Sequence, residues 1–73
     1  MSKDPFLEGL QSAIGTAVEL KPGTRLADVP EWDSLTIMST VTYLAVECQV
    51  NVTFTDMKEA VLVSDIMKKA GVE

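Results

Sequence analysis

Only residues 50–55 alternate apolar and polar side chains with the period of a β-strand. Val50, Val52 and Phe54 are the apolar members of this run. No second run can pair with it, since the apolar segment 61–63 is too short, and a lone strand leaves its backbone groups without partners. We therefore predict an all-α fold in which this segment is an extended loop that turns alternate apolar side chains into a helical core.

The length and charge of the chain limit its fold and its partners. Its 73 residues suit a single domain, 1–73, and a chain of this size buries only about 60% of the surface that it exposes when unfolded. Apolar residues make up 47% and aromatic residues 5%, which predicts a mainly aliphatic core. Six basic residues against eleven acidic ones give a net charge of −5. This charge disfavours binding to nucleic acid or to an anionic membrane, and favours protein partners with basic patches.

The residues needed for most catalytic sites are missing. The chain has no histidine and a single cysteine, Cys48, which excludes Ser-His and Cys-His pairs, zinc clusters and disulfide scaffolds. We expect no catalytic residues, no metal ligands and no enzyme activity. No apolar segment follows Lys3, so no signal peptide is visible, and the longest uncharged run, 34–46, is shorter than the roughly 20 residues of a membrane span. A cytoplasmic protein that is not inserted in a membrane is expected.

The first half of the chain predicts one helix followed by a long loop. Asp4 can cap a helix whose first residue is Pro5, and the breaker cluster 21–23 ends it near Leu20. Its apolar stripe comprises Phe6, Leu7, Leu10, Ile14, Ala17 and Val18. The following loop extends to Asp33, and we expect three of its side chains to pack under the helices. These are Leu26, Val29 and Trp32, with Trp32 closing one end of the core.

The second half predicts three further helices. One begins at Asp33 or Ser34 and ends near Gln49. Its predicted inward stripe is Leu35, Met38, Val41, Ala45 and Cys48, flanked by Ile37 and Leu44. A short helix begins between 53 and 56 and ends near 61, and a last helix begins at Leu62 or Ser64 and ends at Ala70. The predicted fold is therefore a small four-helix up-and-down bundle with three longer helices and one short helix.

Several side chains have simple structural interpretations. We expect the last helix to stop at Gly71. Three acids are interpreted as capping or solvating charges: Asp56, Glu59 and Asp65. The methionines predicted to fill the core are Met38, Met57 and Met67. Cys48 is interpreted as a small core residue, because buried thiols behave as hydrophobes.

Ser34 is the most informative polar residue. It places a hydroxyl at the N-terminus of the second predicted helix. An anionic group attached there would face free backbone N–H groups and the positive end of the helix dipole. The simpler interpretation is that Ser34 is only the N-cap of this helix.

The order of these features resembles the acyl carrier proteins, the four-helix carriers of fatty acid and polyketide biosynthesis. The resemblance spans about 6–70, and its strongest local piece is Asp-Ser-Leu at 33–35. A second piece, Val-Ser-Asp-Ile at 63–66, is similar to the Thr-Val-Gly-Asp-Leu opening of the family's last helix. Residues 47–52 stand where the family has an acidic helix end, a glycine and an isoleucine pair.

The resemblance implies a covalent cofactor on Ser34, which lies between Asp33 and Leu35. A magnesium-dependent phosphopantetheinyl transferase would join the Ser34 hydroxyl to the 4′-phosphopantetheine half of coenzyme A and release 3′,5′-ADP. The thiol of the arm would then hold an acyl group as a thioester. The chain would be a monomeric protein substrate for acyl-loading and acyl-processing enzymes.

The chain departs from the family along the second helix, where the typical acidic residues are missing. The acids near Ser34 instead precede it, at Asp28, Glu31 and Asp33. We predict that partners contact Asp28 and Glu31 in the loop and a hydroxyl-rich or apolar helix face. That face comprises Thr36, Ile37, Ser39, Thr40 and Tyr43.

The same departure bears on the pathway. It favours a dedicated carrier in a specialised polyketide, modified-lipid or aminoacyl pathway, and the missing Leu-Gly-Gly-His-Ser signature of peptidyl carriers favours acyl cargo. The alternative function is a small helical protein-interaction module without a prosthetic group.

Overall fold

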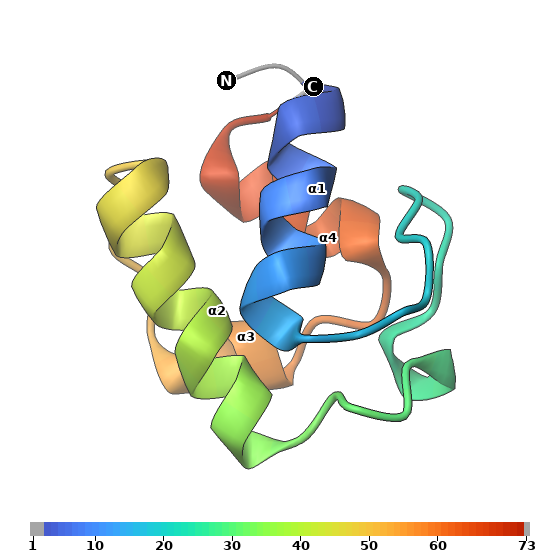
Figure 1. Ribbon diagram of the computed structural model, residues 1–73. Coiled ribbons are helices and arrows are strands. Elements are labelled where there is room, and N and C mark those ends of the chain that lie inside the picture. Colours follow the sequence, from blue (N-terminus) through green and yellow to red (C-terminus); the bar gives the residue numbers. More distant parts are fainter. Residues whose placement is uncertain (1–2, 73) are drawn as a thin grey trace.

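Four α-helices form the regular structure of residues 3–72, the part of the chain that the computed structural model describes (Figure 1). They are α1 (Lys3–Ile14), α2 (Ser34–Glu47), α3 (Phe54–Lys58) and α4 (Val63–Ala70), and a 3₁₀ turn, η1, spans Leu26–Asp28. No strand occurs in this range, where the isolated bridge between Arg25 and Leu62 is the only β-type pairing. The small, mostly helical fold predicted from the sequence is confirmed.

The alternating segment is an extended connection, as predicted. Its apolar side chains Val50, Val52 and Phe54 are half-buried, and the polar residues between them are exposed. Val52 and Phe54 pack against the hydrophobic core, and Phe54 already begins α3. The period-2 pattern therefore reflects alternate burial on a helical core.

Helix α1 is shorter than predicted. It ends at Ile14 because Gly15 adopts a left-handed conformation with φ 76°, and the N–H groups of Gly15 and Thr16 both bond to the carbonyl of Gln11. Leu20, the predicted end, is nevertheless buried in the core. At the other end Asp4 lies inside the first turn of α1, so its predicted role as the N-cap is wrong.

The loop between α1 and α2 is fixed to the start of α4. Leu26 N–H donates to the Val61 carbonyl and Val63 N–H to the Thr24 carbonyl, both at 2.9 Å. Ser64 N–H adds a third bond of 2.9 Å, to the carbonyl of Pro22. The predicted packing of the loop is confirmed, because Leu26 and Val29 are buried and Trp32 is half-buried against the core.

Helix α2 turns inward only part of the face that was predicted, and the predicted flanking residues Ile37 and Leu44 are buried, as expected. Its buried residues are Ile37, Thr40 and Leu44, with Val41 and Cys48 packed beside them. Three members of the predicted inward stripe are exposed: Leu35, Met38 and Ala45. The apolar residues of α2 lie on all sides of the helix, and Glu47 is its one charged residue. The pattern therefore did not identify which face is buried.

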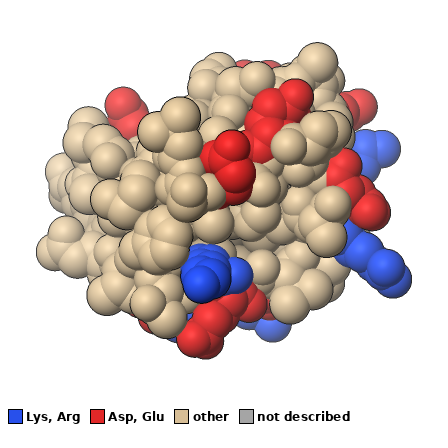
Figure 2. Space-filling model, turned by 90° about the horizontal axis from the view of Figure 1, so that it is seen from below, with Lys and Arg blue, Asp and Glu red and all other residues tan. Residues whose placement is uncertain are grey.

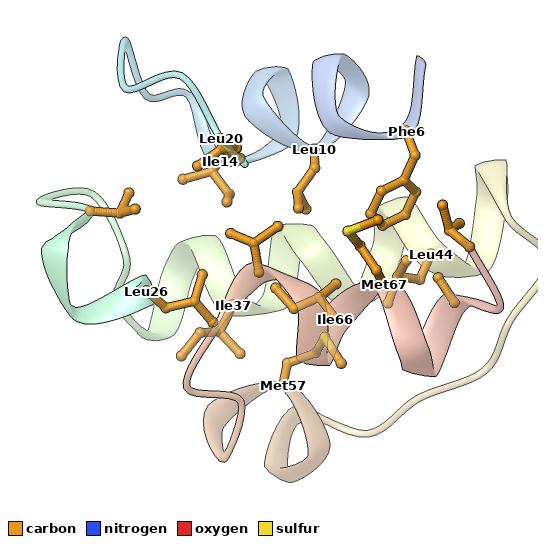
Figure 3. Close-up of a cluster of buried hydrophobic side chains, with 14 residues drawn as sticks. Phe6, Leu10, Ile14, Leu20, Leu26, Ile37, Leu44, Met57, Ile66 and Met67 are labelled. Atoms are coloured by element: carbon orange, nitrogen blue, oxygen red, sulfur yellow. The ribbon is translucent and has the colours of Figure 1, made fainter. Parts of the chain in front are cut away.

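The core is aliphatic and draws on every helix. Helices α1 and α2 pack side by side, and α3 packs against α2. Figure 3 shows Phe6 and Leu10 of α1 pointing toward Met67 and Ile66 of α4, with Met57 of α3 beneath them. The predicted burial of Met57 and Met67 is confirmed, whereas Met38 is exposed.

The ends of the short helices depend on local hydrogen bonds. Thr53 and Asp56 form a capping box that starts α3, with both side-chain to backbone bonds at 3.0 Å. The carboxylate of Asp65 accepts the N–H groups of Val61 and Leu62. The predicted capping role is therefore confirmed for Asp56 and for Asp65. Helix α3 ends at Lys58, earlier than predicted. Helix α4 stops at Gly71, whose φ is 72°, as expected.

Candidate functional site

Ser34 is the exposed first residue of α2, and Asp33 is the residue that caps this helix. One carboxylate oxygen of Asp33 accepts the N–H groups of Leu35 at 2.9 Å and Thr36 at 3.0 Å. In return the Thr36 hydroxyl accepts the Asp33 N–H at 2.9 Å, which completes a capping box. The interpretation of Ser34 as only an N-cap is therefore wrong.

The Ser34 hydroxyl differs from the other serine and threonine hydroxyls of α2. Those four donate to backbone carbonyls: Thr36 to Glu31 at 2.6 Å, Ser39 to Leu35 at 3.3 Å, Thr40 to Thr36 at 2.9 Å and Thr42 to Met38 at 3.2 Å. Ser34 opens the helix, so no helical carbonyl lies one turn before it. Within residues 3–72 its hydroxyl makes no hydrogen bond, and it faces solvent.

The N-terminus of α2 offers fewer free donors than the sequence suggested. Asp33 already binds two of the first backbone N–H groups, and its carboxylate partly neutralises the positive end of the helix. A phosphate joined to Ser34 would therefore lie beside a carboxylate. The capping box leaves few free N–H groups to bind this phosphate. Its attachment would therefore depend on the covalent bond to Ser34.

Three acids lie just before α2. Asp28 ends η1 and is exposed, as is Asp33, whereas Glu31 is half-buried. The Oε1 atom of Glu31 is buried and has no hydrogen-bond partner among the described residues. Figure 2 views the molecule from the end at which α2 begins: acidic groups lie near the centre, and most of the left half is uncharged.

The structure divides the five helix residues predicted to contact partners. Ile37 is 6% exposed and Thr40 is fully buried, so both are wrong as surface contacts: their side chains point into the core. Tyr43 is half-buried, and its hydroxyl donates to the Phe6 carbonyl at 3.0 Å. Thr36 belongs to the capping box, which leaves Ser39 as a partly exposed member of the predicted face.

The sequence interpretation missed three exposed residues of α2. They are Met38, Thr42 and Val46, which continue from Leu35 at helical spacing. That spacing was present in the sequence. It competed with an equally apolar series on the opposite face, so it did not stand out.

Cys48 is the C-cap of α2 and is half-buried against the core. Burial raises the pKa of its thiol above the ordinary value, and neighbouring Glu47 acts in the same direction. The thiolate, which is the nucleophilic form, is disfavoured there. In residues 3–72 no three His, Cys, Asp or Glu side chains are grouped so as to hold a metal ion. No helix in this range has the length and apolar character needed to cross a bilayer.

Comparison with known proteins adds no neighbour. No family model matches the chain, and no curated protein or solved structure is significantly similar to it.

Proposed function

We propose that this chain is an acyl carrier protein with a four-helix up-and-down fold, and that Ser34 is the attachment point of 4′-phosphopantetheine. The thiol of that group would hold acyl intermediates as thioesters. The observation that carries the proposal is the exposed Ser34 hydroxyl, which is free of the helix hydrogen bonds that occupy its neighbours. Asp33 performs the capping, so the hydroxyl is available for modification.

The residues around Ser34 hold it in a defined position. The capping box of Asp33 and Thr36 fixes the first turn of α2, and the Thr36 hydroxyl also bonds to the Glu31 carbonyl. The preceding loop is held by its bonds to the start of α4. A modifying enzyme would therefore meet the serine in one geometry, which reduces the entropy lost on binding.

The surroundings of Ser34 favour a dedicated carrier. The exposed part of α2 carries no acid before Glu47, and the nearby acids Asp28 and Glu31 lie in the loop. We infer that partner enzymes, including a phosphopantetheinyl transferase and acyl-loading and acyl-processing enzymes, contact this loop. A specialised polyketide or lipid pathway with acyl cargo fits this arrangement, and we propose a monomer that acts in the cytoplasm.

The test is the intact mass of the protein after incubation with coenzyme A, Mg²⁺ and a broad-specificity phosphopantetheinyl transferase. We expect a gain of one phosphopantetheinyl unit that the Ser34→Ala variant does not show. Ser39→Ala is the matched control, because it removes a hydroxyl of the same helix that is bonded to the Leu35 carbonyl. No gain under conditions that load a control carrier, or a gain that persists in Ser34→Ala, would contradict the proposal.

A second function, a protein-interaction module without a prosthetic group, is favoured by one observation. Leu35, Met38 and Val46 are large apolar residues of α2 that are exposed to solvent. Such residues can bind a partner whether or not Ser34 is modified. The mass measurement separates the two functions, because a module of this kind gains no mass.

A further inference from the structure

Three hollows on the surface differ in the charge of their linings. One, of about 520 Å³, lies beside the first half of α1 and is bordered by charges of both signs: Lys3, Asp4, Glu8, Glu19 and Lys21. A second, of about 350 Å³, is bordered in the same mixed way by residues of α3, α4 and the turn between them: Asp56, Glu59, Asp65, Lys68 and Lys69. The third, of about 370 Å³, has one charged residue in its lining, Glu47. Of these three hollows the third suits an uncharged ligand best.

The third hollow is an open groove between α1 and α2. Its other lining residues are Ala13 of α1 and four residues of α2: Ser39, Thr42, Tyr43 and Val46. The three hydroxyls of this set donate to backbone carbonyls, at 3.3 Å for Ser39, 3.2 Å for Thr42 and 3.0 Å for Tyr43. A hydroxyl has one proton to donate, so these donors are already used. The groove therefore favours an aliphatic ligand over one that needs hydrogen-bond donors.

Exposed apolar side chains connect the first turn of α2 with this groove. Leu35, Met38 and Val46 are 75%, 48% and 66% exposed, and with 3.6 residues per turn they fall within about 80° of the helix circumference. We call these three residues the outer stripe. A helix at the surface of a domain normally presents a polar outer face, and an aligned set of exposed apolar side chains marks a contact surface.

The groove and the outer stripe lie within reach of a group attached to Ser34. Helices α1 and α2 run antiparallel side by side, so the end of α1 and the start of α2 lie at the same end of the pair (Figure 1). At 1.5 Å per residue, Val46 lies about 18 Å from Ser34 along the helix axis. A tether at Ser34 holds its load at an effective concentration in about the millimolar range. Weak contacts are then sufficient to retain the load on this surface.

The charges at the two ends of α2 disfavour other occupants. Asp33 lies at the start of the helix, and Glu47 lies at its end. A second copy packed antiparallel on the outer stripe would bring Glu47 of each copy toward Asp33 of the other, and a parallel copy would align like charges. Both arrangements are repulsive, as is an anionic lipid surface. An uncharged aliphatic chain meets no such repulsion.

We propose that the groove between α1 and α2, together with the outer stripe, is the resting site of an aliphatic acyl chain carried on the arm at Ser34. This inference rests on the proposed function. It adds a position for the cargo on the outside of the molecule, where the core need not open, and a class of cargo, an aliphatic chain without charged groups. A fully buried CH₂ contributes about a fourfold preference, and an open groove provides a part of it. A chain of several CH₂ groups is therefore retained, whereas an acetyl group is not.

The experiment loads the full chain with a broad-specificity phosphopantetheinyl transferase, from octanoyl-coenzyme A or, as the short-chain control, from acetyl-coenzyme A. Intact mass verifies that each acyl arm is attached. Nuclear Overhauser effects between the acyl group and isotope-labelled protein then locate the chain. We expect contacts to the methyl groups of Ala13, Thr42 and Val46 in the octanoyl form, and none of these contacts in the acetyl form.

A pair of variants tests the groove itself. Val46→Ser removes the exposed valine of the groove and leaves Ser34 unchanged. We expect the contacts between the octanoyl chain and Ala13 to weaken by about threefold or more, because two methyl groups no longer cover the chain. Val61→Ser is the matched control, since it removes a similarly exposed valine outside the groove, and the contacts should remain as in the wild type. Circular dichroism verifies that each variant is folded.

The outcomes separate this inference from the carrier function. Contacts of the octanoyl chain with core side chains such as Leu44 and Ile66 would place it inside the molecule, and contacts with no side chain would place it in solvent. Either result overturns the inference, as do unchanged contacts in Val46→Ser or an equal loss in Val61→Ser. The gain in mass would still support the carrier function in each of these cases.

Mixed labelled and unlabelled copies give a further test. Contacts between the chain of one copy and the groove of another would assign the groove to a neighbouring molecule and overturn the inference. If the wild-type chain gains no mass, the carrier function is overturned, and this inference with it.

Discussion

The hydroxyl of Tyr43 lies over Gly9 and donates a hydrogen bond to the carbonyl oxygen of Phe6, 3.0 Å away. The Phe6 and Tyr43 rings also contact each other, with centroids 5.7 Å apart. A β-carbon at position 9 would overlap the hydroxyl and lie 2.8 Å from two carbons of the Tyr43 ring. Burial raises the pKa of Tyr43, so the phenol remains a donor. At this contact α1 and α2 approach each other closely.

We therefore expect Gly9→Ala to destabilise the protein, although alanine is ordinarily the better helix former. Overpacking costs about 1–3 kcal/mol and helix propensity returns about 1 kcal/mol, so a net loss of up to about 2 kcal/mol is expected in urea denaturation. In a Tyr43→Ala background the same change should stabilise by up to about 1 kcal/mol. Gly9→Ala that stabilises the wild type would show that the two helices can separate at no cost.

Gln49 is a position at which the native residue is unfavourable. It follows the C-cap of α2 with φ 56°, a left-handed conformation that glycine adopts without strain. Gln49→Gly should raise the free energy of unfolding by about 0.5–1 kcal/mol, and Gly71→Ala, at φ 72°, should lower it by a similar amount. Thermal melts of both variants test the pair. Equal melting temperatures for Gln49→Gly and the wild type would contradict this prediction.

Thr40 tests whether burial excludes a residue from partner recognition. It is fully buried, and its hydroxyl donates to the Thr36 carbonyl at 2.9 Å, an oxygen one turn back along the helix. Thr40→Val should leave the free energy of unfolding unchanged or raise it by up to about 1 kcal/mol, because the hydroxyl that is lost makes only this bond within its own helix. Loading by the transferase should keep its wild-type KM. An increased KM in a folded Thr40→Val protein would return this residue to the contact surface.

The loss of stability at acidic pH should depend on Asp56 and Asp65. Backbone hydrogen bonds, from Thr53 to Asp56 and from Leu62 and Val61 to Asp65, lower the pKa of each carboxyl below its ordinary value of 3.8. A folded-state pKa below the unfolded one stabilises above the unfolded pKa, and this contribution is lost as pH falls through the folded pKa. Unfolding free energy should therefore decrease as the pH falls below about 4.

The matched variants for this pH prediction are Asp56→Asn and Asp65→Asn, which retain an acceptor oxygen and remove the charge. Their stability should vary less with pH in this range than that of the wild type. The free energy of unfolding is measured by urea denaturation at several pH values. If it depends on pH in the same way in the wild type and the variants, other carboxyls cause the loss of stability at acidic pH.

Local signals predicted much of the fold. The lone alternating run excluded a sheet, Gly71 marked the end of α4, and the loop residues Leu26 and Val29 were correctly placed in the core. The predicted end of α1 is wrong because it depends on the breaker cluster at 21–23, whereas Gly15 ends the helix before that cluster. That choice between two breakers depends on how Leu20 packs, which is a tertiary contact.

The candidate site was predicted in part. The start of α2 at Ser34 follows from local sequence, but Asp33 and Ser34 are both good caps, and only the structure shows that Asp33 takes the role. The sequence predicts Thr40 on the surface, and Ile37 both on the surface and beside the inward stripe, because a helix that is apolar all round gives no preferred face. The orientation of α2 is defined by tertiary contacts, such as that of Tyr43 with Phe6 of α1, which the local sequence does not show.

The bonds that join the loop at 22–26 to the chain at 61–64 have a consequence for the order in which the protein assembles. Helix α2 and its capping box depend on local contacts and can form early. The bonds between the loop and α4 close a loop of nearly forty residues, which has an entropic cost, so they form later. The loop that precedes Ser34 therefore takes its final position only once α4 has docked. If the chain is a carrier, as proposed, a transferase would meet its folded substrate during synthesis only after the last residues of α4 had left the ribosome.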